Sequence, residues 1–271
     1  MKIARVFPAK TNMSPEDQDA YFAEPGLFTP EYDEVHISVT FTWDIEKANW
    51  LKKQWEVIAP VKIGGPAIDG EGNGFVPEVY LKKGITITSR GCPNRCPWCF
   101  INKPLKELKI MPGNNIIDNN ILACSNSHLD KVFQMLKSQR KINFSGGLEA
   151  PRITQEIAEK LRGLKIDQLF LAYDNLSRFN DLRKAVGILR KYFSRRYIRC
   201  YVLIGYYGDT LEKAELRLRQ AWEIGSLPFA MRYRTPAENW NDSFLFNQRE
   251  WNLFARKWTR PAIIKTIMGV R

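Results

Sequence analysis

The sequence predicts an α/β protein whose larger part is a parallel sheet bent into an open, three-quarter barrel of six strand–helix units. From residue 84 onward, short apolar runs alternate with segments in which apolar residues recur at helical spacing. Strands that alternate with helices pair in parallel through right-handed crossovers. A cysteine-rich loop follows the first of these strands, and functional loops of such barrels lie at the carboxyl ends of the strands.

The first 68 residues predict a smaller α/β unit, half of a doubly wound, flavodoxin-like domain. Its last strand runs into Gly64-Gly65-Pro66, and the glycine-rich stretch that follows makes residues 69–83 a linker. In chain order, the expected elements are the strands Ile3–Phe7 and Val35–Phe41, the helix Glu46–Val57 and the strand Val61–Ile63.

The predicted barrel spans residues 84–235, and its helices carry the clearest signals. Apolar residues recur at helical spacing over 129–136 and 182–189. Asp209, with Glu212 three residues later, starts a further helix in the manner of a capping box, and Gly225 ends it. The six expected strands are Gly84–Thr88, Ile116–Ala123, Lys141–Phe144, Gln168–Ala172, Ile198–Ile204 and Pro228–Tyr233.

Residues 236–271 predict a helical tail that covers the barrel. Trp251, Phe254 and Trp258 fall on one helical face, and Pro261 is expected to end that helix. Basic residues interleave with these aromatic residues, a pattern that can bind nucleic acid. A core-facing stripe is the more common meaning of such a pattern, and it is the one expected here.

The chain is strongly basic, with 41 Lys and Arg against 29 Asp and Glu, a net charge of +12 and an isoelectric point near 9.5. This surplus favours an anionic substrate such as a nucleic acid or nucleotide, although a solvated basic surface would also produce it. No apolar run reaches the roughly 18 residues that a membrane span needs. Without a disulfide framework or an export signal, the cytoplasm is the expected location.

The most informative residues are Cys92, Cys96 and Cys99, spaced C-x3-C-x2-C. Three thiolates in eight residues can hold an iron–sulfur cluster by three corners and leave one iron without a protein ligand. Zinc is the alternative, but it prefers four protein ligands, usually as two separated pairs. Candidates for a fourth ligand are Cys124, Cys200, His36 and His128, none of which belongs to a second paired motif.

With Trp98 before the third cysteine and Phe100 after it, the motif resembles the signature of the radical S-adenosylmethionine (radical SAM) superfamily. The resemblance implies a partial (βα)6 TIM-like barrel and a [4Fe–4S] cluster bound by the three cysteines. It implies reductive cleavage of S-adenosyl-L-methionine to a 5′-deoxyadenosyl radical that abstracts hydrogen from a substrate. It also implies an electron donor such as flavodoxin or ferredoxin.

The Gly-Gly-Pro turn at residues 64–66 resembles the cobalamin-type branch of that superfamily. The D-x-H-x-x-G cobalamin signature is absent and the N-terminal unit is short, so we expect a truncated remnant without cobalamin. Cys124 and Cys200 are too few for an auxiliary cluster, and both are expected to be inert thiols.

The same resemblance suggests residues for the cofactor site at the strand ends. Glu149 would bind the amino group of S-adenosylmethionine and Arg152 its carboxylate. Asn119 and Asn120 would line the site, although an Asx-capped turn explains them equally well. The full set of expected cofactor-binding residues is Trp98, Phe100, Asn119, Asn120, Glu149, Arg152, Tyr173, Asp174 and Arg232.

The sequence therefore predicts a radical SAM enzyme with one cluster and an unidentified substrate. The alternative is a non-catalytic nucleic-acid-binding module stabilised by zinc or by a cluster. In such a module, removal of the metal would unfold the domain and S-adenosylmethionine would not be cleaved.

Overall fold

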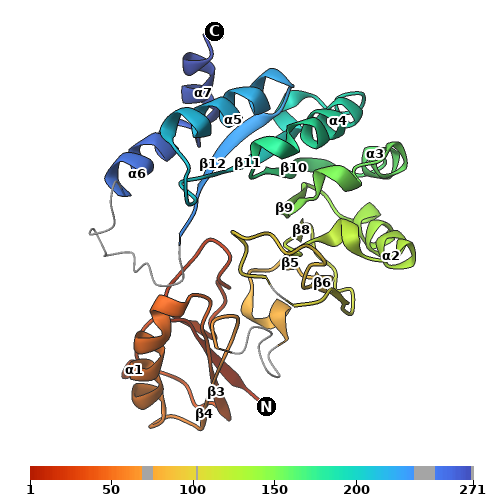
Figure 1. The fold of residues 1–271 in the computed structure, drawn as a ribbon. Coiled ribbons are helices and arrows are strands. Elements are labelled where there is room, and N and C mark those ends of the chain that lie inside the picture. Colours follow the sequence, from red (N-terminus) through yellow and green to blue (C-terminus); the bar gives the residue numbers. More distant parts are fainter. Residues whose placement is uncertain (69–75, 102, 235–247, 270–271) are drawn as a thin grey trace. The chain divides into compact units, whose positions relative to one another are not determined.

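A computed structural model describes residues 1–68, 76–101, 103–234 and 248–269 (Figure 1). The chain divides into two compact units, Met1–Ile85 and Thr86–Arg234, the second of which includes the described C-terminal helices. Both units combine helices with parallel sheets, so the predicted α/β class is confirmed. Residues 69–75 of the predicted linker and 236–247 of the predicted tail lie outside the described residues.

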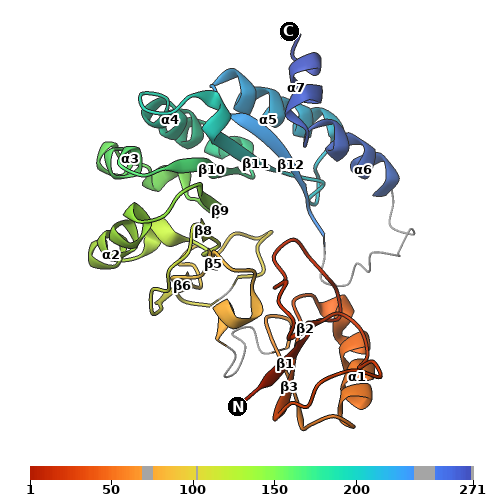
Figure 2. The same cartoon turned by 180° about the vertical axis from the view of Figure 1, so that it is seen from behind.

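The first unit is a parallel sheet with strand order β2-β1-β3-β4 and one long helix, α1 (Figure 2). The two-residue strand β2 was not predicted from the sequence. Gly65 follows β4 with φ +110°, and a Cβ there would lie 2.7 Å from the carbonyl oxygen of Val39, so only glycine fits this turn. The elements are β1 (Ile3–Val6), β2 (Ala20–Tyr21), β3 (Glu34–Ser38), α1 (Ile45–Trp55) and β4 (Val61–Gly64).

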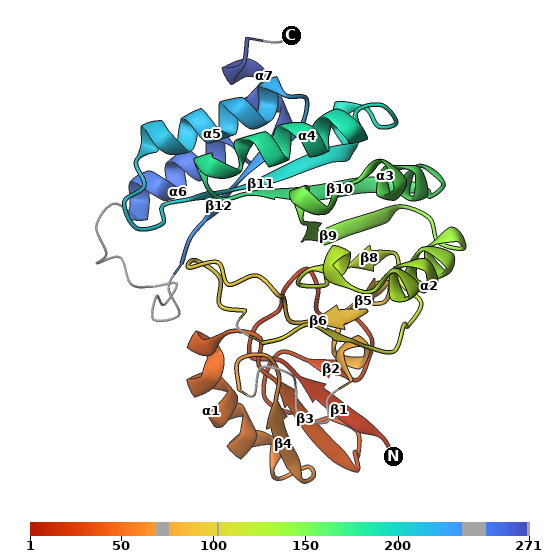
Figure 3. The same cartoon turned by 45° about the vertical axis from the view of Figure 1, so that its right-hand side comes forward.

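The second unit contains a six-stranded sheet with order β12-β11-β10-β9-β8-β5, whose edge strand β5 begins at Ile85, the last residue of the first unit. The four helices that connect its strands all lie along one face of the sheet (Figure 3). The strands are β5 (Ile85–Thr86), β8 (Asn115–Ile116), β9 (Ile142–Leu148), β10 (Ile166–Tyr173), β11 (Ile198–Ile204) and β12 (Leu227–Arg232). The helices are α2 (Asn126–Lys137), α3 (Gln155–Arg162), α4 (Phe179–Leu189) and α5 (Leu211–Glu223).

Alternation along β11 shows how this sheet is buried. Ile198, Cys200, Val202 and Ile204 are fully buried in the core formed with the helices, and the residues between them are only partly buried. The apolar stripes of α2 and α4 supply the other side of that core, as the sequence predicted. Burial of these side chains, at about 25 cal/mol per Å² of apolar surface, is the main stabilising contribution.

Two predicted strands are much shorter in the structure than in the sequence analysis. The second was expected at Ile116–Ala123, but β8 ends at Ile116 and a 3₁₀ turn follows at Ile121–Ala123. The first was expected to reach Thr88, but β5 ends at Thr86. The side chains of Asp118 and Asn119 instead accept hydrogen bonds from backbone N–H and hydroxyl groups of the chain that follows β5.

The third strand is longer than predicted. Gly146 and Gly147 were expected in a loop after the strand, but β9 continues to Leu148. A Cβ on Gly146 would lie 2.3 Å from the carbonyl oxygen of Asp118, and Gly147 has φ +94° beside a shift in the register with β10. The pair therefore forms a bulge that allows close backbone approach within the sheet.

The start of α5 also differs from the prediction. Thr210, not Asp209, is the N-cap and accepts a hydrogen bond from the backbone N–H of Lys213. The Asp209 carboxylate instead pairs with the Arg217 guanidinium, with both side chains only 7% exposed. It also accepts the backbone N–H of Gly205, so this ion pair secures the turn after β11. Gly225, with φ +100°, follows the helix end as predicted.

In the described part of the tail, α6 (Gln248–Lys257) and α7 (Pro261–Ile267) follow one another. Trp258 is 1% exposed and its carbonyl accepts the backbone N–H of Ala230 in β12, so the expected core role is confirmed. Pro261 does not end the first helix but begins the second, a position where its missing N–H has no cost. Within the described residues, no helix is both long and apolar enough to span a bilayer.

Candidate functional site

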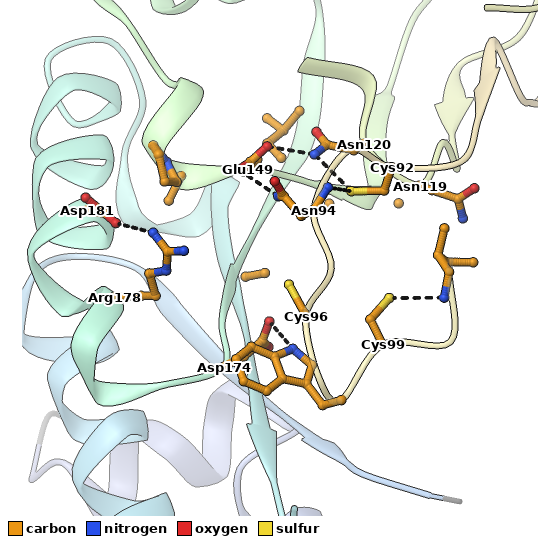
Figure 4. A pocket seen from close by; sticks show the side chains of 18 of the residues that line it. Cys92, Asn94, Cys96, Cys99, Asn119, Asn120, Glu149, Asp174, Arg178 and Asp181 are labelled. Carbon is orange, nitrogen blue, oxygen red and sulfur yellow. Dashed lines mark hydrogen bonds and ion pairs between the residues drawn. The ribbon is translucent and has the colours of Figure 1, made fainter. Parts of the chain in front are cut away.

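The three cysteines border one cavity of about 430 Å³ at the carboxyl ends of β9 and β10 (Figure 4). All of its lining residues belong to the second unit. From the predicted cofactor set, the cavity collects Trp98, Phe100, Asn119, Asn120, Glu149 and Asp174.

The cysteine loop is closed at its base by a short antiparallel pair, β6 (Ser89–Arg90) with β7 (Lys106–Glu107). The backbone N–H of Cys92 donates to the carbonyl of Lys103 at 3.0 Å. Gly91 has φ +80°, and a Cβ there would lie 2.0 Å from the Pro104 carbonyl oxygen. The two ends of the loop are therefore held next to each other, and the three cysteines lie on the segment between them.

Several N–H groups point at the cysteine sulfur atoms. The backbone N–H of Asn94 and the side-chain amide of Asn120 donate to Cys92 Sγ, each at 3.4 Å. The backbone N–H of Ile101 donates to Cys99 Sγ at 3.4 Å. Donors at these positions suit sulfur that carries negative charge, and hydrogen bonds to ligand sulfur tune iron–sulfur clusters.

Three consecutive residues after β8 hold the chain that leads into the loop. The Asp118 carboxylate, 1% exposed, accepts the Thr88 N–H and hydroxyl at 2.7 Å and the Ser89 hydroxyl at 2.6 Å. Asn119 Oδ1 accepts the backbone N–H of Gly91 at 3.0 Å. Asn120 in turn donates to Cys92 Sγ, as described above. We call these three residues, Asp118, Asn119 and Asn120, the Asp-Asn-Asn clamp.

Glu149 receives donors from three segments of the chain. Asn94 donates to Oε1 at 2.8 Å, and Asn120 and the Nε of Arg152 donate to Oε2 at 2.7 and 2.6 Å. Burial by itself raises the pKa of Glu149, but the three donors together outweigh it and hold that pKa below its usual value. The cavity wall therefore carries an ionised carboxylate whose position is fixed.

Cys96 and Asp174 lie on the other side of the cavity, where Trp98 Nε1 donates to Asp174 Oδ2 at 3.1 Å (Figure 4). Burial raises the pKa of the Cys96 thiol, and the neighbouring Cys99, Asp174 and Cys92 raise it further. Burial likewise raises the pKa of Asp174, against the effect of the Trp98 hydrogen bond. A bound cation would favour the ionised forms of all these groups.

Three predicted residues do not border the cavity: Arg152, Tyr173 and Arg232. Arg152 contacts it only through its ion pair with Glu149. Tyr173 is fully buried on the opposite face of β10, where its hydroxyl donates to Gln220 at 2.6 Å. Successive side chains of a strand point to opposite faces of the sheet, so the next residue, Asp174, faces the cavity instead.

Replacing Tyr173 with Phe should therefore leave the cavity unchanged. We expect a loss of about 1 kcal/mol in the free energy of unfolding, from the hydrogen bond to Gln220, and no change in ligand affinity at the cavity. Denaturant unfolding measures the first quantity, and equilibrium dialysis with S-adenosylmethionine, the ligand expected from the sequence resemblance, measures the second. Weaker ligand binding with unchanged stability would contradict this placement.

The sequence analysis missed several lining residues, among them Asn94, Arg178 and Asp181. Asn94 lies between the first two cysteines, so the motif itself could have suggested it. Arg178 follows β10 and pairs with Asp181 at the start of α4, at 3.3 Å. No local pattern distinguishes this arginine from the many others in the chain.

Within the described residues, no three His, Cys, Asp or Glu side chains converge closely enough to hold a single metal ion. Neither the protein-family models nor the curated proteins searched contain a match to this chain. The site is therefore interpreted from its own residues. Cys124 and Cys200, 7% and 0% exposed, lie in the core and do not border the cavity.

Proposed function

We propose that this protein is a radical SAM enzyme that binds a single [4Fe–4S] cluster through Cys92, Cys96 and Cys99. The observation that carries the proposal is that these three thiols, spaced C-x3-C-x2-C, border one cavity together with an ionised glutamate and several amide groups. Other metals do not account for this combination as well. Structural zinc prefers four thiol or imidazole ligands, and among the described residues the cavity is lined by three thiols and no imidazole.

The residues present fit both the cluster and its co-substrate. Three thiols with N–H donors on two of their sulfur atoms suit a cluster with one open iron. Glu149 is placed to bind an ammonium group. Arg178 borders the cavity and Arg152 does not, so Arg178 is the better candidate for a carboxylate partner; its ion pair with Asp181 is exposed, and a bound carboxylate would compete with Asp181 for the guanidinium. Trp98, held by Asp174, offers an aromatic face to the adenine.

The arrangement of the strands also supports the proposal. Six strands in one sheet, with four connecting helices on one face, are compatible with a partial barrel, although the connection from β5 to β8 carries the cysteine loop and no helix in the described residues. The cysteine loop lies at the carboxyl ends of the strands, where functional loops of such barrels lie. The smaller unit, with its parallel sheet and Gly64-Gly65-Pro66 turn, fits the proposed flavodoxin-like remnant.

When bound here, the reduced cluster would supply the electron that cleaves S-adenosylmethionine to methionine and a 5′-deoxyadenosyl radical. The chain's own part is to hold the co-substrate by its charged groups, keep it oriented, and shield the cavity from water. A low-potential protein such as flavodoxin or ferredoxin would provide the electron. This chemistry needs a reducing compartment, so a cytoplasmic location goes with the proposal.

The proposal is tested by anaerobic purification, reconstitution with iron and sulfide, and reduction in the presence of S-adenosylmethionine. We expect a brown protein with about four irons per chain that forms 5′-deoxyadenosine. A colourless protein that holds zinc, forms no 5′-deoxyadenosine and unfolds when chelated would favour the non-catalytic binding module instead.

A further inference from the structure

We propose that the mouth of the cavity binds an unpaired nucleobase of a single-stranded nucleic acid. This inference deepens the proposed function, on which it rests, by naming the substrate class of the same site. The structural feature that carries it is a group of five aromatic side chains in mutual contact, which we call the aromatic rim: Trp98, Phe100, Tyr206, Tyr207 and Tyr233.

The rim joins the cysteine loop to the turns after β11 and β12. The rings of Trp98 and Tyr206 have centroids 5.9 Å apart, and those of Phe100 and Tyr233 are stacked at 6.0 Å. Tyr206 and Tyr233 meet edge to face at 4.9 Å. The Tyr206 hydroxyl also donates to the carbonyl of Pro97 at 3.3 Å. These contacts hold the rings as a connected surface rather than as separate side chains.

The outer members of the rim are open to solvent. Tyr207 is 76% exposed and Phe100 is 57% exposed, and Phe100 also borders the cavity. Exposed, contacting aromatic rings at the edge of a cavity suit a planar ligand, since stacking on them needs no rearrangement of the core. Such a platform accepts any base, because every base has a π-face.

Charge favours a nucleic acid over an aromatic peptide. Arg95 lies on the cysteine loop, and Lys106 and Lys109 lie on the segment by which the chain leaves it. All three are exposed, and none forms an ion pair with a described residue. The chain as a whole carries a net charge of +12. Cations without an ion pair, carried by the loop that holds Trp98 and Phe100 and by the segment that follows it, and an aromatic platform are the two components of sequence-tolerant single-strand binding.

A single strand is favoured over a duplex for a geometric reason. In a duplex the faces of the bases are stacked on each other, so an aromatic side chain reaches one only if the base is unpaired or flipped out. A base stacked on Phe100 at the edge of the cavity would also bring its nucleotide toward the cysteine loop, where the proposed chemistry takes place.

Fluorescence anisotropy with labelled RNA and DNA of roughly 12 nucleotides, single-stranded and duplex, tests the inference on the full chain. We expect the single strands to bind more tightly and their affinity to fall steeply with salt. Phe100→Ala and Tyr207→Ala should each weaken binding about five-fold or more. Phe28→Ala is the matched control, because Phe28 is 92% exposed in the other unit and should have no effect.

Charge is tested in the same assay. Lys106→Ala should weaken binding and reduce the salt dependence, and the control Lys184→Ala, an exposed lysine on α4, should do neither. Equal binding of duplex and single strand, or affinity unchanged by both rim variants, would overturn the inference. If the protein forms 5′-deoxyadenosine but its binding of nucleic acid does not depend on the rim, this inference fails and the proposed function stands. If a colourless, inactive protein binds single strands through the rim, the proposed radical SAM function fails and the binding surface stands.

Discussion

Replacing Cys99 with Ala is expected to abolish 5′-deoxyadenosine formation and to remove most of the reconstituted iron and sulfide. A cluster held by three protein thiolates would lose one of its three anchors, and no other thiol among the described residues lines the cavity to replace it. The fold should survive, because Cys99 is exposed and its Sγ accepts only one backbone hydrogen bond, from Ile101. Iron and sulfide analysis, visible absorption and circular dichroism measure these outcomes.

The matched control is Cys200→Ala. Cys200 is fully buried in β11 and lies apart from the cavity, so this variant should lose some stability but keep its cluster and its activity. If Cys99→Ala instead unfolds the second unit while Cys200→Ala does not, the loop is a structural metal site and the binding-module alternative gains support.

Replacing Asp118 with Ala is expected to lower the free energy of unfolding by about 3 kcal/mol or more. The substitution leaves three donors of Thr88 and Ser89 without their acceptor in a buried region, and each unsatisfied donor costs roughly 1–3 kcal/mol. Denaturant unfolding of the full chain measures the loss. Cluster content should fall as well, since the clamp holds the chain that leads into Cys92.

Asp118→Asn separates the role of the acceptor from that of the charge. The amide keeps the shape and one acceptor oxygen, so it should cost clearly less than Ala if hydrogen bonding is what matters. Burial raises the pKa of Asp118 despite its three donors, which means that the charge itself is costly to bury. An Ala variant as stable as the wild type would show that the clamp does not hold the loop.

Local patterns in the sequence predicted most elements of the fold. Helical apolar stripes placed α2 and α4, and β-strand runs placed β10 and β11 to within a few residues. The errors fell where polar residues decide the structure. One example is the polar segment Asp118–Asn120, which lies within an apolar run. The strand β8 ends before this segment, because its side chains bond to residues almost 30 positions earlier in the chain.

The candidate site shows the same division. Its three cysteines are recognisable because their motif is a spacing within eight residues of the sequence. Arg178 and the aromatic rim were not recognised as one site, because their members come from loops after different strands. Tyr173 was misplaced because residues 169–173 are all apolar, so the sequence does not show which face of the strand is the core face; in the structure Tyr173 shares the fully buried face with Leu169 and Leu171.

The sequence by itself determined the α/β class, the parallel pairing and the cysteine motif, because each depends on residue types at short, regular intervals. The tertiary structure decided which side chains meet at the cavity: Glu149 with Asn94 and Asn120, and Trp98 with Asp174. Those contacts depend on the bulge at Gly146-Gly147 and on the register of neighbouring strands. Since one residue of shift turns a side chain to the opposite face of a sheet, only the assembled strands determine which groups line the cavity.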